Sequence, residues 1–312
     1  MDEDGDAPTA RHSRSSGHAQ RAAEAVWWAV QGSPARRLMG NRWSRAVRRH
    51  LARRGPGDRL FRDGDLTFEA PGDVAGWYAQ HPFEPLLVDW LRSQLRRGHT
   101  AVDVGANVGL ATVRMAQLVG PAGRVVAVEP FEDNLRCLRR NLRRHHLEQV
   151  VVVPVAAGSD HRQRDFRLGS TTATHGFFEH PQGSSGTVVR VTQAPLDELV
   201  GDPVDLVKID VEGAELEVLG GMERILSFNP GLRLSVEWNP ACLATAGEEA
   251  VALPRRLQAL GFSLEVLDDC GFDAGFGTVR SVEQVLAALD AGALHPHWYG
   301  NLACTPTTVT SV

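Results

Sequence analysis

The chain has 312 residues, of which 43% are hydrophobic and 23% charged, and its formal net charge is −5. This composition suits one α/β core domain with extensions, or two small domains, and the charge gives no general attraction to nucleic acid. The four cysteines are far apart and form no CxxC pair, which excludes a metal knuckle or a disulfide framework and favours a reducing compartment. No secretory signal opens the chain and no apolar run reaches ~18 residues, so we expect a cytoplasmic protein without a membrane span.

The first part of the chain predicts two segments outside the core. Residues 1–20 are polar and contain Gly, Ser and Pro, which predicts a disordered tail. Residues 21–57 are rich in arginine and predict helices. These helices are either solvated and weakly docked, or a surface for an anionic or carrier-bound partner. The remaining residues, 58–312, are expected to form one domain.

An alternation of apolar runs and helical patterns follows from residue 58 onward. "DRLFRDGDLTFEAPG" predicts short strands, and "HPFEPLLVDWLRSQL" predicts a helix with apolar residues three and four positions apart. Strand-like runs such as "TAVDV", "RVVAVE", "VVVVPVAA" and "LRLSVEW" then alternate with helices over 109–119, 132–145, 213–227 and 248–260. This order predicts an α/β fold with a doubly wound, mostly parallel sheet.

One segment interrupts this alternation. Residues 161–196 are too long for a simple loop and contain two strand-like pieces, "DFRL" and "TVVRVTQ". They predict a small β-hairpin inserted after the third strand, with the Gly/Ser/Thr-rich stretch between them as its tip. Long loops over a rigid sheet are usually functional or disordered, so this insertion is a candidate lid.

The strongest motif is "AVDVGANVG", residues 101–109, in which a buried strand runs into a glycine turn that opens a helix. Its pattern is D-x-G-x-N-x-G, with Asp103, Gly105, Asn107 and Gly109, and it differs from the dinucleotide fingerprint GxGxxG. A pyrophosphate site is therefore not predicted. An acid before the first glycine suits a ligand that carries an amine, and the alternative is a tight turn without a ligand.

A second acid ends the next strand. Glu129 follows "RVVAV", and ligands of open α/β sheets bind beyond the carboxyl ends of the strands. A carboxylate there can accept both hydroxyls of a ribose. The alternative is a surface acid that caps the following helix.

Together, "DVGANVG", "VVAVEP" and "VKIDVEGAELEVLGG" resemble the FkbM family of class I S-adenosylmethionine-dependent methyltransferases over about residues 70–240. The resemblance implies a seven-stranded Rossmann-like sheet, S-adenosylmethionine as methyl donor, and usually an O-methylated sugar or secondary metabolite as product. It also implies that Asp103 and the loop from Gly105 to Gly109, including Asn107, hold the methionine portion. By the same resemblance Glu129 holds the ribose, and the segment with Ala157 and Ser159 faces the adenine.

The stretch "DLVKIDVEGAELEVLGG" carries several acids and the only lysine of the chain, Lys208. Asp210 stands at a strand's carboxyl end, and the resemblance implies that it faces the cofactor's methionine end and the reacting methyl group. Glu212 is open to a functional or a capping role, whereas Glu215 is expected to stabilise the start of a helix. Lys208 is expected to pair with the neighbouring acids.

The next strand contributes Glu237 and, two residues later, Asn239. Hard oxygen ligands at neighbouring strand ends would suit Mg²⁺, so Asp210, Glu237 and Asn239 are a hypothetical magnesium site. Alternatively, Glu237 is a general base or binds the substrate hydroxyl. His175, on the predicted insertion, is either a solvated loop residue or a group that reaches the substrate.

These residues predict an O-methyltransferase, with Asp210, Glu237 and His175 as candidates to receive the acceptor's proton. The acceptor is expected to be a small molecule, free or bound to a carrier, and not a nucleic acid. N-methylation of an amino sugar or similar amine, a nicotinamide dehydrogenase and a non-catalytic binding protein are the alternatives.

Overall fold

The computed structural model describes residues 57–171, 174–201, 203–269 and 277–307. The predictions of a disordered tail and of basic helices therefore lie outside the described residues, apart from residue 57. Within the described part of the chain, no helix is both long and apolar enough to span a bilayer.

An eight-stranded sheet forms the centre of the fold, with the order β12-β11-β13-β10-β9-β3-β4-β5. Five neighbouring strands, from β10 to β5, run parallel, while β13 is antiparallel to β10 and β11. The strands are β3 (Thr100–Val104), β4 (Arg124–Val128), β5 (Val150–Val153), β9 (Leu206–Ile209), β10 (Arg233–Trp238), β11 (Phe262–Asp268), β12 (Thr278–Arg280) and β13 (Gly300–Pro306). The predicted doubly wound, mostly parallel sheet is confirmed. The strand beyond the expected seven is β12, which is too short to show a strand pattern in the sequence.

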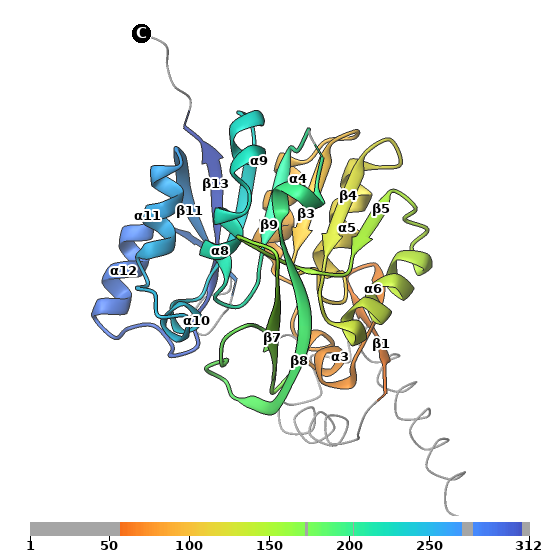
Figure 1. The fold of residues 1–312 in the computed structure, drawn as a ribbon, viewed down its shortest axis with the longest axis horizontal. Coiled ribbons are helices and arrows are strands. Elements are labelled where there is room, and N and C mark those ends of the chain that lie inside the picture. The colour runs from red at the N-terminus through yellow and green to blue at the C-terminus, as the bar shows by residue number, and fades with distance from the viewer. Residues whose placement is uncertain (1–56, 172–173, 202, 270–276, 308–312) are drawn as a thin grey trace, which may run out of the picture. The chain divides into compact units, whose positions relative to one another are not determined.

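Helices cover both faces of this sheet (Figure 1). They are α3 (Gly72–Tyr78), α4 (Pro85–Gln94), α5 (Leu110–Val119), α6 (Glu132–Arg144), α7 (Leu196–Leu199), α8 (Glu215–Gly220), α9 (Glu223–Phe228), α10 (Pro240–Thr245), α11 (Ala252–Ala259) and α12 (Val282–Asp290). Successive residues of one strand point to opposite faces, so alternate residues share a face. Accordingly, Ala101 packs with α4, α5 and α6, while Val102 and Val104 pack with α8, α9 and α11.

Two predicted elements are interrupted in the structure, each for a different reason. The helix expected over 213–227 is split into α8 and α9, because a Cβ on Gly221 would lie 1.9 Å from the carbonyl oxygen of Gly158. The run "VVVVPVAA" also breaks, at Pro154, which has no N–H for the ladder. Its first half is β5 of the main sheet, and its second half, β6 (Ala156–Gly158), pairs with β8 of a small second sheet.

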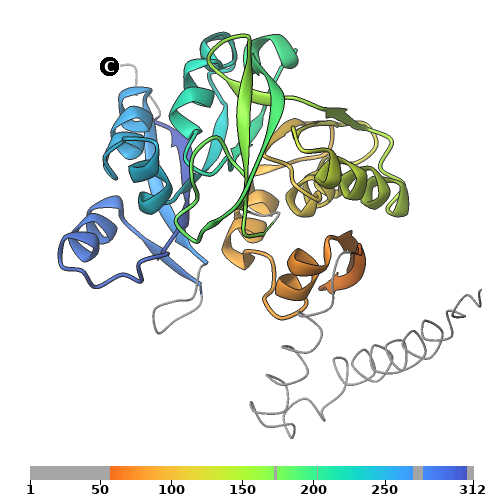
Figure 2. The ribbon, with the colours of Figure 1, turned by 60° about the horizontal axis from the view of Figure 1, so that its bottom comes forward.

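The predicted insertion is a long antiparallel hairpin of β7 (Arg162–Gly169) and β8 (Ser184–Pro195). With β6 it makes a three-stranded sheet of order β6-β8-β7, which has its own apolar cluster around Phe166, Phe177 and Val191. The hairpin extends on the side of the main sheet where α10 and α3 lie (Figure 1). Figure 2 shows it, in green, between the blue C-terminal elements and the yellow-green helix α6. Its action as a lid stays a prediction.

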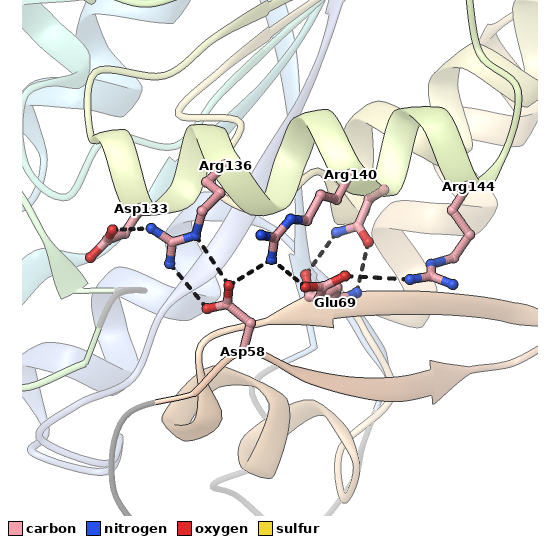
Figure 3. A network of polar contacts seen from close by, with 7 residues as sticks. Asp58, Glu69, Asp133, Arg136, Arg140 and Arg144 are labelled. Atoms are coloured by element: carbon pink, nitrogen blue, oxygen red, sulfur yellow. Dashed lines mark hydrogen bonds and ion pairs between the residues drawn. The ribbon is translucent and has the colours of Figure 1, made fainter.

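A second hairpin, β1 (Arg59–Asp63) and β2 (Leu66–Ala70), is held against α6 by polar contacts (Figure 3). Arg140 of α6 donates to Glu69 at 2.6 Å and to Asp58 at 2.9 Å. The buried Asn141 side chain exchanges two hydrogen bonds with the Glu69 backbone and donates to the carbonyl of Val108 at 2.8 Å. Asn141 therefore joins this hairpin to the glycine loop after β3.

Candidate active site

Acidic side chains stand at the carboxyl ends of four adjacent strands. In sheet order these are Glu237 on β10, Asp210 after β9, Asp103 on β3 and Glu129 after β4. Asp103 and Lys208 are register partners on neighbouring strands, which places their side chains next to each other. The structure therefore brings the sequence-predicted acids to one edge of the sheet, where ligands of such folds bind.

Lys208 is the central cation of this edge. Its Nζ lies 2.8 Å from Oδ2 of Asp210 and 3.9 Å from Oδ1 of Asp103, and the residue is only 2% exposed. Burial by itself would lower the pKa of Lys208, but the carboxylates of Asp210, Asp103 and Glu84 outweigh it and raise the pKa above its ordinary value. Lys208 thus stays charged, as the sequence predicts for a counter-charge.

Asp103 is fully buried beneath the glycine loop. Its Oδ2 accepts a hydrogen bond from the Thr112 hydroxyl at 2.5 Å, whereas Oδ1 has no hydrogen-bond partner among the described residues. Burial raises the pKa of Asp103, although Lys208 and Thr112 act in the opposite direction. A buried oxygen without a donor costs free energy, so this atom is suited to accept a hydrogen bond from a ligand.

The glycines of the loop are required by close packing. Gly105 has φ +80°, and a Cβ there would lie 1.7 Å from the carbonyl oxygen of Asp210. Gly109 has φ +94°, and its Cβ would lie 2.6 Å from Cδ1 of Leu138 on α6. Gly105 therefore sets the close approach of the loop to Asp210, and Gly109 sets the approach of α5 to α6.

Glu129 holds the loop from the neighbouring strand. Its Oε2 accepts the backbone N–H of Asn107 at 2.8 Å, and its Oε1 accepts the N–H of Phe131 at 2.8 Å and the amide of Asn134 at 3.3 Å. Burial raises the pKa of Glu129 to about 7, against the lowering effect of these hydrogen bonds. Since a carboxylate offers about four acceptor positions, one remains for a ligand hydroxyl.

The segment expected to face adenine leaves the main sheet. Ala157 is buried in the apolar core and pairs with Ala194 of β8. Ser159 follows β6 and is exposed, and a Cβ on Gly220 of α8 would lie 3.5 Å from its Cβ. The adenine role of these two residues stays a prediction.

Three carboxylates converge beyond Lys208. One oxygen from each of Asp210, Glu212 and Glu237 lies within 4.8 Å of the other two. Glu237 is 7% exposed, and its buried Oε2 has no hydrogen-bond partner among the described residues. Burial, followed by the charges of Glu212 and Asp210, raises the pKa of Glu237 well above its ordinary value. This cluster can therefore accept a proton or bind a cationic group.

Sequence reasoning left Glu212 open and did not single out its partner, His180. His180 is buried, and its Nε2 lies 3.2 Å from Oε2 of Glu212. Because its Nδ1 accepts the N–H of Gln182 at 3.1 Å, Nε2 carries the proton and donates to Glu212. Cys242 of α10 also donates its thiol to this oxygen at 3.4 Å. No local pattern marks His180, since the contact joins the insertion to the turn after β9.

His175 lies elsewhere on the insertion. Its Nδ1 accepts the N–H of Gly169 at 3.0 Å, and its ring meets the ring of Phe131 edge-on, with centroids 4.8 Å apart. The side chain thus packs between the insertion and the segment before α6. A catalytic role for His175 stays a prediction.

Two further polar residues of the predicted site have structural partners. Glu215, which is 2% exposed, accepts the N–H groups of Gly213 at 3.1 Å and Val211 at 3.3 Å through Oε1. It stabilises the turn before α8 by hydrogen bonds. Oδ1 of Asn239 accepts the N–H of Cys242 at 3.2 Å and caps α10. That oxygen thus has a structural partner, and its role as a metal ligand stays a prediction, whereas an oxygen of Glu212 lies within 4.8 Å of oxygens of Asp210 and Glu237.

Glu84 is another site residue that sequence reasoning passed over, because it stands in the stretch "HPFEPLLVDWLRSQL" that predicts a helix. Its φ is +33°, and its Oε2 accepts the amide of Asn301 at 3.3 Å. Burial raises the pKa of Glu84 to about 8, with Lys208 lowering it and Asp210 raising it further. Glu84 thus adds another carboxyl group close to Lys208 and Asp210.

A parallel sheet with a glycine loop after its first central strand, and with acids at the ends of successive strands, defines a Rossmann-like fold of the class I methyltransferase type. A family model described as the methyltransferase FkbM domain matches residues 103–272, which is more than half of the 312 residues. The chain belongs to this family, as the motifs predict.

Individual relatives match shorter parts. A protein-L-isoaspartate O-methyltransferase of Caenorhabditis elegans is 40% identical over 63 residues, 20% of this chain and 28% of that protein. A ribosomal protein L11 methyltransferase of Thermotoga maritima is 27% identical over 96 residues, 31% of this chain and 36% of that protein. The chain thus spans about a third of these curated relatives. The crystal structure of an FkbM methyltransferase from Methylobacillus flagellatus is similar with a TM-score of 0.42 and 17% identity, over 66% of this chain and 43% of that one.

Proposed function

We propose that the protein transfers the methyl group of S-adenosylmethionine to a hydroxyl group of a small molecule, such as a sugar or a secondary metabolite. The observation that carries this proposal is the arrangement of Asp103, Lys208 and Asp210 beside the carboxylates of Glu212 and Glu237. It combines a buried acceptor for the donor's ammonium group with proton acceptors for the acceptor's hydroxyl, on the ligand-binding edge of the sheet.

The residues present fit the methyl donor. The Oδ1 of Asp103 supports binding of the ammonium group, since it is a buried acceptor that receives no hydrogen bond among the described residues, although Lys208 Nζ lies 3.9 Å away. Glu129 offers a remaining acceptor position to a ribose hydroxyl, and it also fixes the loop through the N–H of Asn107. The donor, when bound, supplies an electrophilic methyl group on a sulfonium ion.

The chain's own residues would align the acceptor and receive its proton. An attacking hydroxyl loses its proton during transfer, and a carboxylate within hydrogen-bond reach accelerates this step. Asp210 and Glu237 are the groups that we assign to this role, with His175 as a further candidate. Lys208 orients Asp210 through the 2.8 Å contact.

Two measurements test this proposal. Calorimetry with S-adenosylhomocysteine should show binding to the wild type, and Asp103→Asn should weaken it at least tenfold. Thr100→Ser, a conservative change at the opposite end of β3, should bind like the wild type. Incubation of candidate sugars and metabolites with labelled methyl donor should then yield a labelled product by mass spectrometry, and Asp210→Asn should abolish it. Absence of S-adenosylhomocysteine binding to the wild type would refute the assignment.

An amine acceptor is the second candidate, and the surplus of acids favours it. Lys208 is the only lysine of the chain, and the carboxyl groups of Glu84, Asp103 and Asp210 all act on its charge. Glu212 and Glu237 add two more carboxyl groups beside Asp210. Such a surplus would attract an ammonium group. Fragmentation of the labelled product separates the candidates, because it locates the methyl group on oxygen or on nitrogen.

A further inference from the structure

We propose that Asp210, Glu212 and Glu237 form a binding site for one hard divalent cation, such as Mg²⁺ or Mn²⁺. The three residues come from the end of β9, from the turn that follows it and from the neighbouring strand β10. Cation binding at these residues rests on their geometry alone. A second part of the proposal, that the bound cation helps to place the acceptor hydroxyl, rests on the proposed function.

The spacing of the oxygens fits one ion. One oxygen from each carboxylate lies within 4.8 Å of the other two. Oxygen ligands of Mg²⁺ lie about 2.0–2.1 Å from the ion, so ligands on opposite sides of it are about 4 Å apart. Small side-chain adjustments would therefore bring the three carboxylates around a single ion.

An unsatisfied buried atom at this cluster points independently to a ligand. Glu237 is buried, with only 7% of its surface exposed, and its Oε2 has no hydrogen-bond partner among the described residues. A buried carboxylate oxygen without a donor is costly. A cation bound to Glu237 would remove this cost.

The charges around the cluster lead to the same inference. Lys208 contacts Asp210 and Asp103, and no contact joins it to Glu212 or Glu237 among those found in the described part of the chain. His180 donates to Glu212 but does not reach Glu237 by hydrogen bond. Three carboxylates this close repel one another unless protons or a cation compensate them.

The insertion holds the middle ligand in place. Glu212 has φ +53°, an uncommon conformation for a residue with a side chain, which persists only when its surroundings enforce it. A Cβ on Gly176 of the insertion would lie 3.3 Å from the Cβ of Glu212, so the loop packs directly on this residue. His180 orients the carboxylate by its hydrogen bond to Oε2, as outer partners of metal ligands commonly do. His180 is thus a positioning residue for the site.

Electron paramagnetic resonance of Mn²⁺ tests the site without a methyl acceptor. Titration of the wild type should remove the signal of free Mn²⁺ with a stoichiometry of one ion per chain. Glu237→Gln and Glu212→Gln should each weaken binding at least tenfold. Glu198→Gln is the matched control, because it removes the same charge from an exposed residue that pairs with His161 at 2.6 Å. Competition by Mg²⁺ should restore the free signal.

Positioning by His180 is tested in the same assay. His180→Ala should weaken Mn²⁺ binding several-fold, His180→Gln should restore part of it by supplying a donor, and His161→Ala should leave it unchanged. Calorimetry with S-adenosylhomocysteine on every variant separates this proposal from the methyl-donor site, since Glu237→Gln should bind it normally. A wild type that leaves millimolar Mn²⁺ free, or equal binding by Glu237→Gln and Glu198→Gln, would overturn the cation site even if S-adenosylhomocysteine binds.

Discussion

Lys208 and Asp210 form a close ion pair, Nζ to Oδ2 at 2.8 Å, in which the lysine is almost fully buried and the aspartate side chain is 27% exposed. They are two residues apart in the chain: Lys208 is the last but one residue of β9, and Asp210 is the first residue beyond the strand. The pair therefore links the stability of the central sheet to the placement of the carboxylate that we assign to the reaction.

Removal of Lys208 should be costly for this reason. Lys208→Met leaves Asp103 and Asp210 without their cation, and we expect the free energy of unfolding to fall by about 3–5 kcal/mol, as is typical of a broken buried pair. Urea denaturation measures this change. The double variant Lys208→Met with Asp210→Asn should recover part of the loss. A double variant less stable than the single one would contradict the pairing.

Binding of the methyl donor should depend on pH through Glu129. Because burial raises its pKa to about 7, the carboxyl group is mainly protonated below that pH and mainly ionised above it. An ionised group is the better acceptor for ribose hydroxyls, so the affinity for S-adenosylhomocysteine should fall by up to about tenfold per pH unit below 7. Calorimetry at pH 5.5–8.5 measures this, and Glu129→Gln should flatten the profile as well as weaken binding. The same slope in Glu129→Gln would assign the titration to another group.

Glu215 should affect the pH dependence of stability. Burial raises its pKa from 4.5 to about 7, so between these values the folded chain binds a proton that the unfolded chain releases. The free energy of unfolding contributed by this group should therefore decrease as the pH rises from 4.5 to 7. Glu215→Gln keeps an acceptor for Gly213 and Val211 but does not titrate, so the difference between the two stability curves should grow with pH in this window.

The alanine variant at the same position separates hydrogen bonding from titration. Glu215→Ala leaves the N–H groups of Gly213 and Val211 without their acceptor, which should cost about 1–3 kcal/mol. Chemical denaturation at pH 5, 6, 7 and 8 provides both comparisons. Equal stabilities of Glu215→Ala and Glu215→Gln would show that these hydrogen bonds do not matter.

The contacts between the β1–β2 hairpin and α6 should differ in strength. Asn141→Ala leaves buried backbone groups of Glu69 and Val108 unpaired, and we expect a loss of about 2–3 kcal/mol. Arg140→Ala removes ion pairs of a side chain that is 41% exposed, which should cost about 1 kcal/mol or less. Thermal or urea unfolding of the two variants checks this order, and the reverse order would refute it.

The fold was largely predictable because its periodicity is local. Leu87, Trp90 and Leu91, at spacings of three and one, lie on the buried face of α4, and the paired strands around a glycine turn form β1 and β2. The family motifs located the acids at 103, 129 and 210, and the end of the next predicted strand located the acid at 237. Parallel strands end at one edge, so residues at those ends converge wherever the sheet order is known.

The remaining features depend on contacts between distant residues. Helix 213–227 is divided because Gly221 touches Gly158, a contact over more than sixty residues that no helical pattern encodes. His180 was not predicted because its partner Glu212 lies on another element, and the candidate on the insertion was His175, which stands beside Phe177 and Phe178 in the sequence. Asn239 has the right chemistry for a ligand, but its oxygen caps the helix that begins one residue later.

Gly105 has a consequence for anyone who would redesign this protein. A methyl group at that position would overlap the carbonyl oxygen of Asp210, since their separation would be only 1.7 Å. Mutational libraries that alter acceptor choice should therefore leave position 105 constant and sample the insertion loop around residues 177–182 instead. Tolerance to change is expected to be lowest where two backbones touch, and position 105 joins the glycine loop after β3 to the end of β9 by such a contact.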